Sequence, residues 1–268
     1  MKRTSALPLP PREMRKLVGP TDDADFDNPT ATLVYPWVPA DDYRAVFDFG
    51  CGCGRVARQL LLQDPAPEQY VGIDAHAGMI AWCQRELAPY AGSFRFEHHD
   101  VYQQFMNPDQ AKPRVLPFPV GDATASLVIA LSVFTHLVEY QAEHYLEEVA
   151  RVLHDEGSFV SSWFLFDKRA FPVLQPHMNA LFVSDADPAH AVLYDRNWLV
   201  GITGRLGMRL THVVPPSIRG FQWLLTFQPA SRGNPEIALP ADEAPFGSWE
   251  PPHLDTSDVG RFGLEDDS

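Results

Sequence analysis

The stretch that decides the fold is "VFDFGCGCGRVARQL", residues 46–60. It begins as an apolar run that contains Asp48, continues with glycines at Gly50, Gly52 and Gly54, and ends in an amphipathic pattern. Glycine allows a tight turn and the close approach of a ligand, because it has no Cβ atom. In open parallel sheets, ligands bind beyond the carboxyl ends of the strands. The stretch therefore predicts a buried strand, a ligand-binding turn and a helix.

Strand and helix patterns alternate from residue 45 to residue 165. Apolar runs predict strands at 45–49, 69–74, 93–100, 125–134 and 158–166, and helical spacing appears at 55–63, 77–87 and 140–153. The unbroken run of the fourth strand is typical of a central strand that is covered on both faces. This alternation predicts an α/β fold with a doubly wound, Rossmann-like sheet.

The last two predicted strands, 208–214 and 220–227, differ from the others. Only the short segment 215–219 separates them, and a parallel crossover needs a longer connection. We therefore expect a mostly parallel sheet with one reversed strand near the edge.

Composition divides the chain into zones. Residues 1–44 form a proline-rich N-terminal extension or lid, and 45–228 form the main domain, with an irregular insertion at 166–190. Residues 229–268 contain nine acids and six prolines against two arginines. This composition predicts a disordered tail.

The charge and composition of the chain exclude several classes of protein. Hydrophobic residues make up 45% of the 268 residues, which suits a globular fold, and the net charge is -14. Nucleic-acid binding usually requires a basic surface, so we expect no nucleic-acid partner. No apolar stretch reads as a signal peptide or a membrane span, so a soluble cytoplasmic protein without a membrane partner is expected.

The three cysteines, Cys51, Cys53 and Cys83, lack the spacing of a metal site. We therefore expect no metal, and we interpret the thiols as small apolar side chains.

Acidic residues follow three successive predicted strands. Asp48 lies at the end of the first, Asp74 closes the second and Asp100 lies at the tip of the third. An acid at the end of the second strand is well placed to accept hydrogen bonds from the two hydroxyls of a ribose. The three acids and the glycines should meet around one nucleoside-sized crevice.

The glycine motif alone does not define the ligand. Counted from Gly52, the run Gly52-x-Gly54-x-x-Ala57 also satisfies the dinucleotide fingerprint. The reversed strand at the end of the sheet is not part of the usual dinucleotide fold. The acidic rim favours a cationic ligand over a pyrophosphate.

With these features the chain resembles the class I S-adenosylmethionine-dependent methyltransferases. The resemblance covers residues 45–165 well and 191–228 more loosely, and it rests on "VFDFGCGCGR" (46–55), "YVGIDAHAGMIAWC" (70–83), "FEHHDV" (96–101), "SLVIALSVFTHL" (126–137) and "YLEEVARVLHDEGSFVSSWF" (145–164). "SVFTHL" followed by "EHYLEEVARVL" looks most like the bacterial methyltransferases that accompany glycosyltransferases. One departure is "HDEG" at 154–157, where the family commonly has a Pro-Gly turn.

The resemblance implies S-adenosylmethionine as the cofactor and assigns roles by position. The residues it implies are Asp48, Gly50, Gly52 and Gly54 for the methionine part, Asp74 with His76 and Met79 for the ribose, Asp100 and Val101 for the adenine, and Ser132 and Phe134 for the floor near the methyl group.

His136 is the candidate catalytic residue, because it follows the fourth strand, where an acceptor would lie beside the methyl donor. With an ordinary pKa of about 6.5, it can take a proton from an attacking hydroxyl. A structural histidine bonded to nearby backbone is the alternative.

The predicted function is O-methylation of a sugar or another small polar acceptor, so the partner is a small molecule or a glycan. Methylation of a non-sugar metabolite, a nicotinamide-dependent oxidoreductase and a non-catalytic cofactor-binding protein stay as alternatives. The sequence does not define the oligomeric state.

Overall fold

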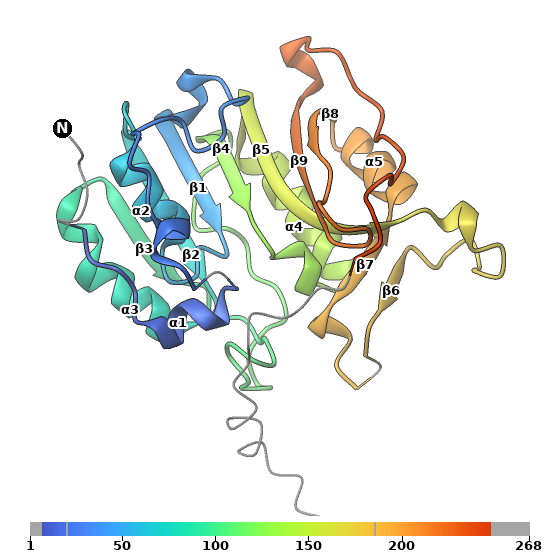
Figure 1. Cartoon of the computed structure of the whole chain (residues 1–268), viewed down its shortest axis with the longest axis horizontal. Helices are drawn as coiled ribbons and strands as arrows, with labels where there is room; N and C mark the ends of the chain where they lie inside the picture. Colours follow the sequence, from blue (N-terminus) through green and yellow to red (C-terminus); the bar gives the residue numbers. More distant parts are fainter. Residues whose placement is uncertain (1–6, 20, 185, 248–268) are drawn as a thin grey trace, which may run out of the picture.

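A nine-stranded sheet forms the centre of the computed structural model (Figure 1), which describes residues 7–19, 21–184 and 186–247. Its strands are β1 (Ala45–Phe49), β2 (Gln69–Asp74), β3 (Phe94–His98), β4 (Ala125–Ala130), β5 (Leu153–Phe166), β6 (Ala180–Phe182), β7 (Val192–Asp195), β8 (Met208–Val214) and β9 (Gln222–Pro229). The parallel part has the order β3-β2-β1-β4-β5-β7. Strand β9 pairs antiparallel with β5, and β8 pairs with β9. The prediction of a mostly parallel sheet with a reversed strand near the edge is confirmed.

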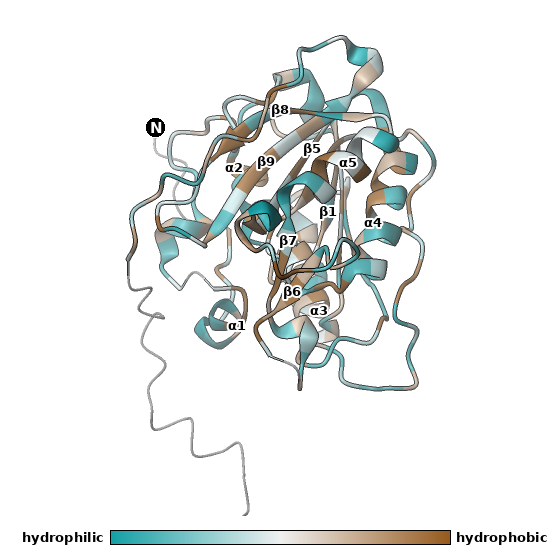
Figure 2. Cartoon of the chain, turned by 90° about the vertical axis from the view of Figure 1, so that its right-hand side faces the viewer, coloured by the Kyte–Doolittle hydropathy of each residue, from teal (hydrophilic) through white to brown (hydrophobic). Residues whose placement is uncertain are grey.

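Helices cover both faces of the sheet. One face carries α2 (Arg55–Leu62) and α3 (Ala77–Glu86), and the other carries α4 (Glu139–Val152) and α5 (Arg196–Arg205), whereas α1 (Arg12–Leu17) lies beyond the carboxyl ends of the strands (Figure 1). Side chains alternate along a strand: Phe47 and Phe49 join the core under α4 and α5, whereas Val46 joins the core under α2 and α3. Figure 2 shows α4 with its hydrophilic residues turned away from the mostly hydrophobic strands.

Strand β5 is longer than β4, and this difference shapes one end of the sheet. Ser161 pairs with Ala130 of β4 on one side and with Leu225 of β9 on the other. Beyond the end of β4, Phe164 still pairs with β9 and takes Leu193 of β7 as its second neighbour. The β6–β7 segment therefore lies beyond the carboxyl end of β4, and α1 lies at the same end of the parallel strands (Figure 1).

Two sequence predictions need correction here. The fourth strand ends at Ala130 instead of residue 134, because Ser132 adopts a left-handed conformation with a φ of 56° that a strand cannot continue through. The insertion at 166–190 is also less irregular than predicted, because its strand β6 pairs with β7.

The first part of the predicted disordered tail packs on the domain. The backbone N–H of Ile237 donates to Leu210 of β8 at 2.9 Å, and Leu239 packs against the core. Farther along, the backbone N–H of Arg219 donates to Pro245 at 3.0 Å. The free edge of β8 supplies backbone partners that composition could not reveal, so the prediction of disorder is wrong up to residue 247. Residues 248–268 lie outside the described residues.

Within the described part of the chain, no helix has the length and apolarity that a membrane span needs.

Candidate functional site

The glycine turn after β1 requires glycine at each predicted position. Gly50, Gly52 and Gly54 have φ angles of 78°, 54° and 80°, which side chains rarely adopt. The turn is also closely covered. A Cβ atom on Gly50 would lie 2.2 Å from a methyl carbon of Val133, and one on Gly52 would lie 2.7 Å from a methyl carbon of Val18. The turn is thus held between the end of β4 and the residue that follows α1.

Asp74 connects the end of β2 to this turn. Its Oδ2 accepts the backbone N–H of Gly52 at 2.8 Å, and its Oδ1 accepts that of His76 at 2.7 Å. Burial raises the pKa of Asp74, and the two N–H donors oppose the rise. Each carboxylate oxygen has a further lone pair, so Asp74 can still accept hydrogen bonds from two hydroxyls.

Asp48 is the most deeply buried acid of the predicted set, with 2% of its surface exposed. Burial raises its pKa to about 7, while the Tyr70 hydroxyl and the charge of Arg55 act in the opposite direction. A buried acid with a pKa near neutrality beside a glycine turn suits a cationic ligand.

Asp100 and Val101 lie beside the same end of the sheet, directly after β3. The carboxylate of Asp100 accepts a hydrogen bond from Asn107 at 3.0 Å and forms an ion pair with Lys112, and Lys112 holds its pKa below the usual range. The amide of Asn107 also donates to the Val101 carbonyl at 2.9 Å. An adenine amine would therefore share Asp100 with Lys112, and the adenine role stays a prediction.

The residues after β4 divide between the site and the core. The Ser132 N–H donates to the hydroxyl of Ser162 at 2.7 Å, and its own hydroxyl donates to Gln222 at 3.0 Å. Phe134 is fully buried and stacks on Trp163 with a centroid distance of 4.2 Å. Phe134 therefore packs in the core directly after the turn at Ser132, and its predicted place on the floor near the methyl group stays a prediction.

Met79 is completely buried next to the glycine turn. It forms a small cluster with Phe26 and Cys53, and Met14 and Val18 from the α1 segment pack against this cluster. The segment around α1 therefore covers the turn. The role of residues near 14–19 as a lid over the cofactor stays a hypothesis.

The cysteines are buried, and all three are free thiols. Burial raises the pKa of Cys53 to about 12 and raises those of Cys51 and Cys83 as well. The thiols stay protonated at neutral pH, as expected for small apolar side chains.

His136 lies where the turn after β4 meets the insertion. Its Nδ1 lies 3.1 Å from the Ala189 carbonyl. A carbonyl oxygen only accepts, so Nδ1 carries the hydrogen and Nε2 keeps a free lone pair. Desolvation by the surrounding protein lowers the pKa of His136, while the backbone of Ala189 and His190 and, to a smaller extent, the carboxylate of Asp187 oppose this effect. His136 thus bonds to backbone and also keeps the tautomer that a base needs.

The sequence reasoning missed Tyr35 and Val133. Tyr35 lies in the N-terminal extension but packs in the same core as Cys51 of the glycine turn. A single aromatic residue in a proline-rich segment carries no signal of such a position. Val133 was part of a quoted motif, but only the turn at Ser132 brings it against Gly50.

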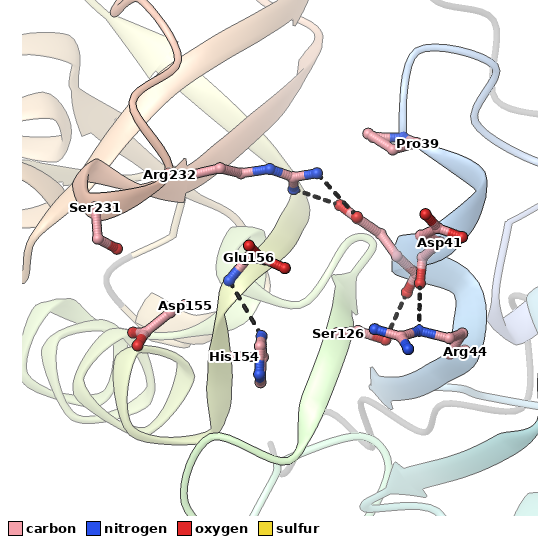
Figure 3. Close-up of a pocket in the computed structure, with 10 residues that line it drawn as sticks. Pro39, Asp41, Arg44, Ser126, His154, Asp155, Glu156, Ser231 and Arg232 are labelled. Atoms are coloured by element: carbon pink, nitrogen blue, oxygen red, sulfur yellow. Dashed lines mark hydrogen bonds and ion pairs between the residues drawn. The ribbon is translucent and has the colours of Figure 1, made fainter.

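A polar cavity of about 520 Å³ lies at the other end of the strands (Figure 3). His154 and Glu156 at the start of β5 line it, together with Arg232, which follows β9. Arg232 forms a two-pronged ion pair with buried Asp42, at 2.7 Å and 3.1 Å, and Ser158 donates to the same carboxylate at 2.6 Å. These contacts join the segment before β1 to the segment after β9. The cavity is separate from the glycine turn.

Comparison with protein families supports the fold. Residues 46–157, somewhat less than half of the chain, match the family described as a methyltransferase domain. An uncharacterized methyltransferase from Emericella nidulans is 27% identical over 120 residues, which are 44% of this chain and 41% of that protein. The chain thus spans less than half the length of this relative.

Two solved structures share the fold. A putative S-adenosylmethionine-dependent methyltransferase from Listeria monocytogenes aligns over 72% of this chain and 93% of that chain, with 12% identity and a TM-score of 0.50. A SAM-dependent methyltransferase from Methanosarcina mazei aligns over 73% of this chain and 98% of that chain, with 15% identity and a TM-score of 0.50. At these identities the likeness concerns the fold.

Proposed function

We propose that this chain methylates a hydroxyl group of a small polar acceptor, because residues 46–157 match a methyltransferase domain and the chain shares its fold with S-adenosylmethionine-dependent methyltransferases. The observation that carries the proposal is the glycine turn between two acids. Gly52 adopts a φ of 54° and donates its N–H to Asp74, while Asp48 lies buried on the strand before the turn.

These residues fit the chemistry of S-adenosylmethionine. The buried carboxylate of Asp48 can hold an ammonium group, and Asp74 can accept hydrogen bonds from the two ribose hydroxyls. When bound, the cofactor supplies a methyl group activated by a positively charged sulfur. The chain mainly has to exclude water and hold the acceptor in line with this methyl group.

His136 is the proposed base for a hydroxyl acceptor. Its Nδ1–H is held by the Ala189 carbonyl, so the proton of the attacking hydroxyl would go to Nε2. The lowered pKa of His136 keeps the ring neutral at physiological pH, and a neutral ring can accept a proton. A sugar or glycoside hydroxyl is the acceptor that the motif similarity favours, and other small hydroxylated metabolites share this chemistry.

Calorimetric titration tests the cofactor before any acceptor is known. The wild type should bind S-adenosylhomocysteine in the micromolar range, and Asp74→Ala should lose at least tenfold in affinity. Asp155→Ala, which changes an exposed acid at the opposite end of the sheet, is the matched control. A preference for NAD, or no binding of S-adenosylhomocysteine, would overturn the proposal.

A further inference from the structure

The hydroxyl of Tyr35 is an unsatisfied polar group in the core. Only 6% of the Tyr35 surface is exposed, and its hydroxyl has no hydrogen-bond partner among the described residues. Two other phenols of the same core are satisfied, since Tyr43 bonds to the backbone of Tyr35 and Tyr70 bonds to Asp48. Buried polar groups are nearly always paired, so an unpaired one calls for an explanation.

Contacts with Trp37 place Tyr35 relative to the strands of the sheet. Trp37 donates its indole N–H to Thr226 of β9 at 2.9 Å, and the ring of Tyr35 lies 5.7 Å from that of Trp37. Across the sheet, Thr226 stands level with Val160, Ile129 and Asp48. Tyr35 belongs to the core cluster of this row, next to the glycine turn.

Two charges act on the phenol from this direction. The carboxylate of Asp48 raises the pKa of Tyr35, and the guanidinium of Arg55 lowers it, in addition to the main effect of burial. Tyr35 therefore lies close to both the acid before the turn and the arginine after it.

Arg55 is the first residue of α2, directly after the glycine turn. In the described part of the chain it forms no hydrogen bond or ion pair through its side chain, although the side chain is partly buried. A cation in the first turn of a helix opposes the helix dipole. The charge of Arg55 is therefore not used to stabilise the helix terminus, and it is available to a ligand.

We propose that Tyr35 and Arg55 bind the α-carboxylate of the methionine part of the cofactor, opposite the α-ammonium that Asp48 holds. This inference rests on the proposed function. A phenol and a guanidinium are both hydrogen-bond donors, and a guanidinium matches a carboxylate in charge and shape. The N-terminal segment, outside the matched family region 46–157, then supplies part of the cofactor site.

Three ligands that differ at the methionine end test the proposal. S-adenosylhomocysteine carries the carboxylate and the ammonium, decarboxylated S-adenosylmethionine lacks the carboxylate, and 5′-methylthioadenosine lacks both. Tyr35→Phe removes only the hydroxyl and keeps the ring. It should weaken the binding of S-adenosylhomocysteine about five- to twentyfold and change the other two dissociation constants less than twofold. Arg55→Gln should show the same selectivity.

The control variant is Tyr140→Phe, which removes an exposed phenol from α4. It should bind all three ligands like the wild type. Unchanged binding of S-adenosylhomocysteine by both Tyr35→Phe and Arg55→Gln would overturn the inference, as would an equal loss for all three ligands, which indicates a packing role. If the wild type binds none of the ligands, the proposed function itself fails.

Discussion

The hydroxyl of Tyr70 donates a 2.7 Å hydrogen bond to Oδ2 of Asp48 on the neighbouring strand. The register places Asp48 opposite Gly72, and a Cβ atom on Gly72 would lie 2.8 Å from the Tyr70 hydroxyl. Gly72 therefore leaves the space through which the phenol reaches the acid. This hydrogen bond lowers the pKa of Asp48, but burial dominates and raises it to about 7.

The pKa of Asp48 predicts how cofactor binding depends on pH. An ammonium group prefers the ionised carboxylate, so below pH 7 the acid must first release its proton. The affinity for S-adenosylhomocysteine should therefore fall as the pH is lowered from 8 to 6, approaching about tenfold per unit for one linked proton. Calorimetry in two buffers of different ionisation enthalpy would count that proton. 5′-Methylthioadenosine, which lacks the ammonium, should show no such dependence, and a flat profile for both ligands would contradict the prediction.

Asp48 should also limit the stability of the cofactor-free protein. Its folded-state pKa of about 7 lies above the ordinary 3.8, so the folded state holds the proton more tightly. The associated stability is present below pH 3.8 and is lost as the pH rises through 7. Asp48→Asn keeps an acceptor for Tyr70 without the charge. The melting temperature of this variant should exceed that of the wild type by several degrees at pH 8.

The difference between the two melting temperatures should shrink steadily as the pH is lowered from 7 toward 3.8, and it should vanish below pH 3.8, where Asp48 is neutral in the folded and the unfolded state. The same variant should bind S-adenosylhomocysteine at least tenfold more weakly at pH 8. A variant that is less stable than the wild type at pH 8 would show that the Asp48 charge is compensated in the empty site.

The glycine turn could be predicted from the sequence because its signals are local. Strand, turn and helix follow one another within residues 46–60. Asp74 could be predicted in the same way, because it ends the next strand along the chain. Tyr70 and Tyr35 could not be assigned this way. Tyr70 contacts Asp48 only because of the register between β1 and β2. Tyr35 belongs to the N-terminal segment and reaches the core beside Cys51 only through tertiary packing.

The errors after β4 and after β9 have physical causes of the same kind. The fourth strand was predicted to reach residue 134, but it ends at Ala130 because Ser132 adopts a left-handed conformation. Residues 230–247 have the composition of a disordered tail, yet the edge of β8 pairs with Ile237. Both outcomes depend on backbone geometry that composition and periodicity do not contain.

Gly52→Ala should weaken cofactor binding strongly. Its φ of 54° is unfavourable for alanine, and the new methyl group would lie 2.7 Å from Val18. Backbone strain of this kind costs about 1–3 kcal/mol, and here it would move the N–H that Asp74 accepts. We expect at least a tenfold loss in affinity for S-adenosylhomocysteine by calorimetry. Gly92→Ala, with no atom near its Cβ position, should bind normally, and equal binding by both variants would contradict the role of the turn.

The charge of Asp187 should raise the pKa of His136. Only 7% of Asp187 is exposed, and its Oδ2 has no hydrogen-bond partner in the described ranges. Its negative charge raises the pKa of His136, whereas burial and the charge of His190 lower it. Asp187→Asn should therefore lower the pKa of His136, as measured by NMR titration of the imidazole. Asp122→Asn, at an exposed ion pair with Arg151, is the control. If the pKa of His136 is the same in Asp187→Asn as in the wild type, Asp187 has no electrostatic role at the candidate site.

The ion pair between Arg232 and Asp42 should matter for stability and not for the cofactor. Asp42 is 3% exposed and accepts hydrogen bonds from both Arg232 and Ser158. Arg232→Met would leave a buried carboxylate without its cation, which costs about 3–5 kcal/mol. Urea denaturation should show this loss. Arg95→Met, which breaks the exposed 3.7 Å pair with Glu97, should cost less than about 1 kcal/mol.

The dissociation constant of S-adenosylhomocysteine tests whether the Arg232–Asp42 ion pair affects cofactor binding as well as stability. Because the pair lies at the amino ends of the strands, Arg232→Met should bind the ligand like the wild type at temperatures where it is folded. A specific loss of affinity in folded protein would mean that the two ends of the sheet are coupled. The Asp42 network would then belong to the functional site instead of only joining the start of β1 to the end of β9.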